Sequence, residues 1–268
     1  MTVLAHERFG HGPERVIVLH EFYGGIRSWD PLRPYLDTQR FQYAFADLRG
    51  YGQSIRMSGE FSAAEIADDV SRLADALGAD RYHLVGHSMT GLAIQHAVLA
   101  DARGAKRIKR AVAVTPAPTN GFEHNEDALN FFRATLTDDE LLGRGFAMLT
   151  GGRWGEGFIR YKTQLNRSSS RPEVMARYMD NVVFLRGLTE EAASAAIETP
   201  LLVIAGAHDA PTMHLAALMA SMNGAFPRAE WLELPEAGHY PMDECPVALA
   251  TAIEQFLRGE SSESPGAH

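Results

Sequence analysis

The 268-residue sequence is poor in cysteine: Cys245 is the only one, so no disulfide bond can form within the chain. It has no apolar run of the length that a membrane-spanning helix needs, and its N-terminus breaks its apolar run too early for a signal peptide. Positive charge is not in excess either. The formal net charge of −9 argues against non-specific binding of nucleic acid. We therefore expect a cytoplasmic protein without a nucleic-acid or membrane partner, while assembly into a homo-oligomer stays open.

The order of apolar and polar segments predicts one α/β domain with an insertion. Hydrophobic residues make up 46% of the chain, enough for a substantial core. Strands and helices alternate, which predicts a mostly parallel sheet preceded by an N-terminal hairpin of residues 3–9 and 15–20. Further strands are expected at 41–46, before Ser88, and at 109–114, 200–206 and 230–234; helices are expected at 62–77, after Ser88, at 212–223 and at 246–258.

Residues 119–195 interrupt this alternation, and we assign them as a helical cap inserted between core segments 1–118 and 196–258. Some of the cap's aromatic and aliphatic side chains, Trp154 among them, would line an apolar pocket, while others would only pack the cap itself. Residues 133–186 carry nine basic and six acidic side chains. These charges could attract an anionic substrate or simply be solvated helix faces. The polar residues 259–268 are expected to be disordered.

The most informative motif lies where a predicted strand turns into a helix at Ser88. An apolar run from Tyr82 leads into Gly86-His87-Ser88-Met89, and a helix-like run starts at Gly91. Such a turn exposes the serine hydroxyl at a helix N-terminus, where free N–H groups favour developing negative charge. On this segment alone, a serine that only caps the helix explains the pattern equally well.

Two other polar residues follow predicted strands. Asp209 comes just after the apolar run 200–206, and His239 lies on a loop beside Gly238, after the strand 230–234. Because the carboxyl ends of parallel strands meet at one edge of the sheet, Ser88, Asp209 and His239 would lie together. Taken singly, Asp209 could be only a turn former and His239 only a packed loop residue.

These segments together resemble the α/β-hydrolase superfamily. The chain order Ser…Asp…His is the order found in that fold. His20 with Gly24-Gly25, the turn Asp47–Ser54, Gly206–Asp209 and Gly238-His239 also match in sequence order. The resemblance covers nearly the whole chain. It implies an α/β-hydrolase fold: a mostly parallel central sheet with helices on both faces and a helical cap insertion.

The resemblance also implies roles. His239 would take the proton of Ser88, and Asp209 would orient the imidazole. The backbone N–H groups of Met89 and Phe22 would form an oxyanion hole. The predicted substrate-binding side chains lie on the loop after the first apolar strand, in the cap, and beside the histidine: His20, Glu21, Tyr23, Trp154 and Tyr240.

Glu21 departs from the family pattern: many members have His-Gly where this chain has His20-Glu21. A carboxylate that faced the oxyanion hole would repel the developing negative charge. Glu21 therefore either turns away and is paired, or is protonated, or contacts substrate. Our hypothesis is that it tunes or positions the substrate and is not the base.

The function that fits these residues best is a serine hydrolase that cleaves a small-to-medium, largely apolar carboxylic ester, lactone or thioester through an acyl-enzyme. No cofactor and no metal is implied, and the partner is a small-molecule ester. Three alternatives stay open: a C–C bond hydrolase of a β-diketone-like substrate, a cofactor-free perhydrolase or haloperoxidase-like enzyme, and a ligand receptor with slow turnover.

Overall fold

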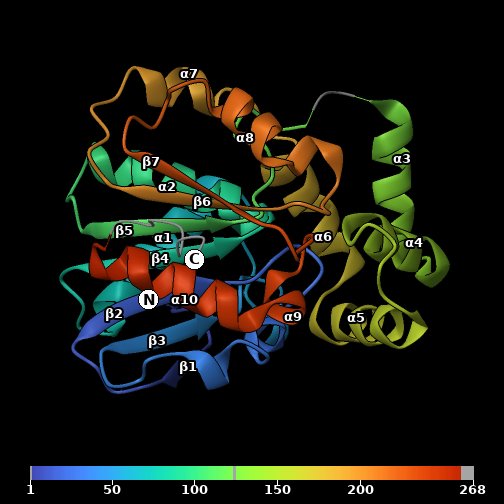
Figure 1. Cartoon of the computed structure of the whole chain (residues 1–268), viewed down its shortest axis with the longest axis horizontal. Coiled ribbons are helices and arrows are strands. Elements are labelled where there is room, and N and C mark those ends of the chain that lie inside the picture. The colour runs from blue at the N-terminus through green and yellow to red at the C-terminus, as the bar shows by residue number, and fades with distance from the viewer. Residues whose placement is uncertain (1, 123–124, 261–268) are drawn as a thin grey trace, which may run out of the picture.

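A computed structural model describes residues 2–122 and 125–260, and a seven-stranded sheet forms the centre of the molecule (Figure 1). The last eight residues of the predicted disordered tail lie outside the described residues. The spatial order of the strands is β1-β3-β2-β4-β5-β6-β7. Their bounds are β1 (His6–Phe9), β2 (Glu14–Leu19), β3 (Phe41–Ala46), β4 (Tyr82–His87), β5 (Ile108–Val114), β6 (Leu201–Gly206) and β7 (Ala229–Leu234).

The predicted mostly parallel sheet is confirmed, but the N-terminal hairpin is wrong. β1 pairs antiparallel with β3, and β2 lies between β3 and β4, parallel to both. The connection from β1 to β2 lies close to the start of β3, since the N–H of Gly12 donates to the carbonyl of Phe41 (3.2 Å). A Cβ at Gly12 would lie 2.0 Å from the backbone of Arg40, so glycine permits this close crossing.

Helices cover both faces of the sheet. On one face α1 (Ala63–Ala76) packs against α2 (Met89–Ala102), and α10 (Pro246–Arg258) crosses the other face in front of the sheet in Figure 1. The hydroxyl of Ser62 accepts from the N–H of Glu65 and so caps α1, whose Ile66, Val70 and Leu73 face the core. The remaining helices of this core are α8 (Leu215–Met222) and the short α9 (Pro241–Glu244).

The segment predicted as a cap is helical, and most of it gathers at one end of the sheet, beside α9 (Figure 1). Its last helix (Leu188–Ala193) lies apart from the others, next to α8, where the hydroxyl of Thr189 donates to the carbonyl of Ser221 (2.9 Å). Asp138 caps one of its helices by accepting from the N–H groups of Glu140 and Leu141. Its α-helices are α3 (Glu126–Thr135), α4 (Asp139–Leu149), α5 (Glu156–Ser169), α6 (Pro172–Tyr178) and α7 (Leu188–Ala193), and a π-helix at Met179–Val183 follows α6. The division at 118/119 and 195/196 stays a prediction.

Within the described part of the chain, none of the helices combines the length and the apolarity needed to cross a bilayer. The cytoplasmic location stays a prediction.

Candidate active site

Ser88 lies at a sharp turn between the fully buried strand β4 and helix α2. Its backbone has φ 57° and ψ −117°, a conformation that residues with a side chain rarely adopt. Two glycines allow the strand and the helix to approach: a Cβ at Gly86 would lie 2.4 Å from the carbonyl oxygen of Thr90, and one at Gly91 would lie 2.9 Å from Pro116. The turn thus holds the Ser88 hydroxyl at the N-terminus of α2.

A continuous series of hydrogen bonds joins Ser88, His239 and Asp209. The Oγ of Ser88 lies 2.8 Å from Nε2 of His239, and Nδ1 of His239 lies 2.7 Å from Oδ2 of Asp209. The other carboxylate oxygen of Asp209 accepts from the N–H of Ala210 (2.6 Å). Asp209 and His239 are buried, whereas Ser88 is partly exposed. The structure therefore brings together the three residues that the sequence places 121 and 30 positions apart along the chain.

The loop that carries His239 is held by its own backbone. The carbonyl of His239 accepts from Oγ1 of Thr115 (3.0 Å) and from Nε2 of His87 (2.7 Å), and its N–H donates to the carbonyl of Leu149 (2.8 Å). The contact of His87 with the His239 carbonyl is a structural one. Leu149 ends α4, so the helical segment contributes directly to the position of the imidazole.

The backbone N–H groups of Met89 and Phe22, the predicted oxyanion-hole donors, are not used in regular hydrogen bonding, and their role as donors stays a prediction. Met89 is the first residue of α2, so its N–H has no carbonyl partner within the helix. Phe22 lies in the turn after β2, and its N–H donates to no other described residue. The hydroxyl of Thr90 donates to the carbonyl of Leu19 (3.1 Å) and accepts from the N–H of His87 (2.9 Å), which ties the Ser88 turn to the end of β2.

Glu21 is buried and ion-paired. Its Oε1 accepts from the Ser28 hydroxyl (2.8 Å) and lies 3.5 Å from Nζ of Lys162, and its Oε2 lies 3.4 Å from Nδ1 of His87. Burial disfavours the charge on Glu21, but Lys162 and His87 outweigh it and hold the pKa of the carboxyl well below its usual range. Of the three arrangements that the sequence allowed, the structure shows the paired one. A contact with substrate stays a prediction.

Two other predicted substrate-binding residues, His20 and Tyr23, already have hydrogen-bond partners in the protein. Nδ1 of His20 bonds the carbonyl of Glu21 (2.7 Å), and its Nε2 accepts from the N–H of Leu48 (3.1 Å). The Tyr23 hydroxyl bonds Oγ1 of Thr135 (3.0 Å). Their contacts with substrate stay predictions.

Trp154 and Tyr240, the last two predicted substrate-binding residues, differ in exposure. Trp154 is 40% exposed and donates from Nε1 to Glu244. Tyr240 is fully buried, and burial raises the pKa of its hydroxyl well above the usual range. A role in substrate binding likewise stays a prediction for both.

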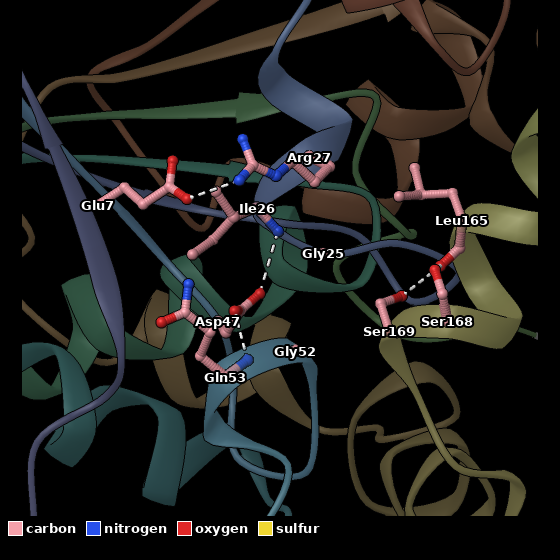
Figure 2. Close-up of a pocket in the computed structure, with 10 residues that line it drawn as sticks. All are labelled: Glu7, Gly25, Ile26, Arg27, Asp47, Gly52, Gln53, Leu165, Ser168 and Ser169. Carbon is pink, nitrogen blue, oxygen red and sulfur yellow. Dashed lines mark hydrogen bonds and ion pairs between the residues drawn. The ribbon is translucent and has the colours of Figure 1, made fainter.

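A cavity of about 170 Å³ lies between the loop after β2 and the C-terminal part of α5 (Figure 2). On the core side, the carboxylate of Asp47 accepts from the N–H groups of Ile26 (3.1 Å) and Gln53 (2.8 Å). On the other side are residues of α5, Leu165, Ser168 and Ser169. Ser88, Asp209 and His239 do not line it, so it marks the junction of α5 with the core and not the serine site.

Gly24→Ala is expected to disturb this loop. A Cβ at Gly24 would lie 2.2 Å from both Oε1 of Glu21 and Oγ of Ser28, so their hydrogen bond would have to move. We expect the free energy of unfolding to fall by about 1–3 kcal/mol in denaturant titrations, as for overpacked cores. Gly157→Ala is the control, because a Cβ there meets nothing within 4 Å. Equal stability of the two variants would contradict the packing described for this loop.

Among the residues that the structure describes, no cluster of three or more His, Cys, Asp or Glu side chains could hold a metal ion.

Comparison with known proteins gives the family. The family model described as "Alpha/beta hydrolase family" matches residues 3–252. The chain belongs to the alpha/beta hydrolase family. This membership supports a hydrolase.

Individual relatives are distant. The chain is 25% identical over 274 residues to the dihydrolipoyllysine-residue acetyltransferase component of an acetoin cleaving system from Pseudomonas putida, covering 93% of this chain but only 65% of that protein. Among solved structures, a bromoperoxidase from Bacillus anthracis has a TM-score of 0.81 at 20% identity, with 94% of each chain covered. A carboxylesterase from Bacillus subtilis has a TM-score of 0.76 at 22% identity, with 95% of this chain and 87% of that one covered. At these identities the two structures establish the fold alone.

Sequence reasoning missed the residues that support the site from a distance. Thr115 contacts the backbone of His239, and Lys162 contacts Glu21. Glu244 accepts from the N–H groups of Gly238 and Tyr240 (2.9 Å each). None of them lies in a motif.

Proposed function

We propose that this protein is a serine hydrolase that cleaves a small-to-medium, largely apolar carboxylic ester, lactone or thioester through an acyl-enzyme. The observation that carries the proposal is the unbroken hydrogen-bond series from Ser88 through His239 to Asp209, starting from a hydroxyl held at a strained turn. A nucleophile bonded to a base, which is itself oriented by a third group, is the arrangement that activates a weak alcohol.

In the proposed reaction, the Ser88 hydroxyl attacks the carbonyl carbon of the ester while Nε2 of His239 accepts its proton. Asp209 accepts from Nδ1–H, so it fixes the tautomer and stabilises the imidazolium. Collapse of the tetrahedral intermediate breaks the bond to the alcohol, which receives the proton from His239. A water molecule then attacks the acyl-enzyme with His239 again as the base, and this step releases the acid and restores Ser88.

The tetrahedral oxyanion would be bound by the N–H groups of Met89 and Phe22. Each such donor is typically worth about 2.7–4 kcal/mol of barrier lowering. Aromatic rings pack next to the site: His239 contacts the ring of Tyr240 (5.2 Å between centroids), and Phe146 contacts both Tyr240 (5.8 Å) and Tyr23 (5.6 Å). These apolar surroundings support an apolar acyl group. The proposed steps need no cofactor and no metal.

Pre-steady-state hydrolysis of p-nitrophenyl esters tests the proposal. With esters of graded acyl length, we expect a burst of p-nitrophenol close to one equivalent per protein, followed by slower turnover. Preferred turnover of a vinylogous diketone over every ester would favour C–C cleavage instead. Tight binding of ligand without turnover would favour a receptor. Either result would overturn the ester hydrolase.

A further inference from the structure

Helix α5 places a lysine ammonium group in the interior of the protein. Lys162 is fully buried, with Nζ 3.5 Å from Oε1 of Glu21, 3.3 Å from Oδ2 of Asp243 and 4.1 Å from the ring centroid of Tyr240. Fully buried lysines are rare, because removing the charge from water is costly unless it is paired. This lysine has two carboxylates and one aromatic face around it.

Lys162 and Glu21 each favour the charged form of the other. Burial disfavours the charged form of Lys162, but Glu21 and Asp243 outweigh it and raise the pKa of its ammonium group above the usual value. Lys162 in turn lowers the pKa of Glu21 against the effect of burial. Burial raises the pKa of Asp243, whose side chain is 12% exposed and can still reach water. Glu21 has no comparable access to water, so it depends on Lys162 for its compensating charge.

The two carboxylates lie next to the proposed oxyanion donor Phe22 and just after the base His239. Glu21 directly precedes Phe22, whose N–H is the proposed second oxyanion donor. Asp243 lies in α9, which begins two residues after His239. One ammonium group on α5 therefore contacts both the loop of the oxyanion donor and the segment that follows the base.

A second contact from the same face of α5 supports this arrangement. Ser169 lies seven residues after Lys162, about two helical turns, so both side chains point to the same side. The hydroxyl of Ser169 lies 2.9 Å from the carbonyl of Gly24 and 2.7 Å from that of Leu165, and it can donate to either. Helix α5 thus holds the loop after β2 at both ends, at Glu21 and at Gly24.

We infer that Lys162 is a positioning residue of the hydrolase. It compensates the charge of Glu21 and, by pairing with Glu21 and Asp243, fixes the loop that carries Phe22 relative to the loop that carries His239. The inference rests on the proposed function. Lys162 itself is shielded from substrate, since it has no exposed surface. The helical segment is then a part of the catalytic framework and not only a cover.

A double-mutant cycle tests this role, with kcat, KM and the Ki of benzeneboronic acid as readouts. We expect Lys162→Met to lower kcat by about 10²-fold, the loss typical of a misplaced catalytic group, with KM within about threefold of wild type. The Ki of the boronic acid, which mimics the tetrahedral state, should rise in parallel. Glu21→Gln should cost about tenfold, and Glu21→Gln/Lys162→Met should return to within about threefold of Glu21→Gln, because the unpaired carboxylate is gone.

Arg160→Met is the matched control, since Arg160 lies on the same helix but is exposed and, among the described residues, pairs only with Glu156 (3.2 Å). Active sites are counted by fluorophosphonate titration, so a merely structural lysine would lower the Tm but leave kcat per site and the boronic acid Ki unchanged. The inference is overturned if Lys162→Met matches Arg160→Met, or if the losses of the two single variants multiply in the double variant.

If Lys162→Met does not fold, Glu21→Gln and the double variant still decide the matter: a double variant more than about tenfold slower than Glu21→Gln overturns the inference. Failure of the proposed function looks different. A folded wild type that neither hydrolyses esters nor reacts with the fluorophosphonate overturns both proposals, whereas an active wild type with an unaffected Lys162→Met variant overturns only this one.

Discussion

Ser88→Ala is expected to lower kcat for ester hydrolysis by about 10⁶-fold, the loss seen when a serine nucleophile that acts with its base is removed. The reason is that the 2.8 Å contact with Nε2 of His239 provides the proton transfer, and no other hydroxyl is bonded to that nitrogen among the described residues. Steady-state rates with a p-nitrophenyl ester, together with the burst amplitude, measure the effect.

The matched control for this variant is Ser168→Ala. Ser168 is exposed on α5, and within the described part of the chain its hydroxyl bonds only the carbonyl of Leu165 in the same helix (3.0 Å). We expect its kcat to stay within about threefold of wild type, as for surface changes remote from the chemistry. A folded Ser88→Ala variant that kept more than a hundredth of the wild-type rate would show that another group attacks the ester.

Asp209→Asn is expected to lower kcat by about 10⁴-fold, the loss known for the equivalent change in a Ser-His-Asp enzyme. The amide keeps the size of the side chain, but it can present an N–H where Nδ1–H of His239 needs an acceptor 2.7 Å away. The imidazole would then adopt the tautomer that cannot take the Ser88 proton. Rates measured on protein with an unchanged circular dichroism spectrum separate this effect from unfolding.

Asp68→Asn serves as the control, because Asp68 is an exposed residue of α1. Its rate should equal that of wild type. A loss of less than tenfold in Asp209→Asn would mean that a different group orients His239 or that the imidazole is not the base.

The serine site could be predicted because each of its three residues lies in a short sequence motif of its own. A glycine on each side of Ser88 permits the tight turn, and Asp209 and His239 lie on the loops that follow β6 and β7. In a parallel sheet the ends of such strands must meet, so three short motifs were enough to predict the contacts now seen at 2.7 and 2.8 Å.

The N-terminal strand pairing was not predictable in the same way. Two strands separated by a glycine-rich turn suggest a hairpin, and both strands exist. The choice of β3 as the partner of β1 depends on β2 being buried between two parallel neighbours, which gives β2 no free edge. The partner of β1 therefore depends on the packing of the whole sheet, and the sequence near the turn does not indicate it.

The buried ionic cluster was missed for a related reason. In the sequence, Lys162 is one of nine basic residues of the helical segment and could not be told from a solvated surface cation. Its partners are 141 residues before it and 81 residues after it. Glu21 was noticed because it departs from a motif, but the lysine that compensates its charge lies in no motif.

Reaction of the purified protein with a fluorophosphonate, followed by intact-mass and peptide-mapping mass spectrometry, tests the central claim most directly. The account predicts one phosphonyl group per molecule, attached to Ser88, and no labelling of Ser88→Ala. Correctly folded protein that takes up no label, or takes it up at a residue other than Ser88, would contradict it.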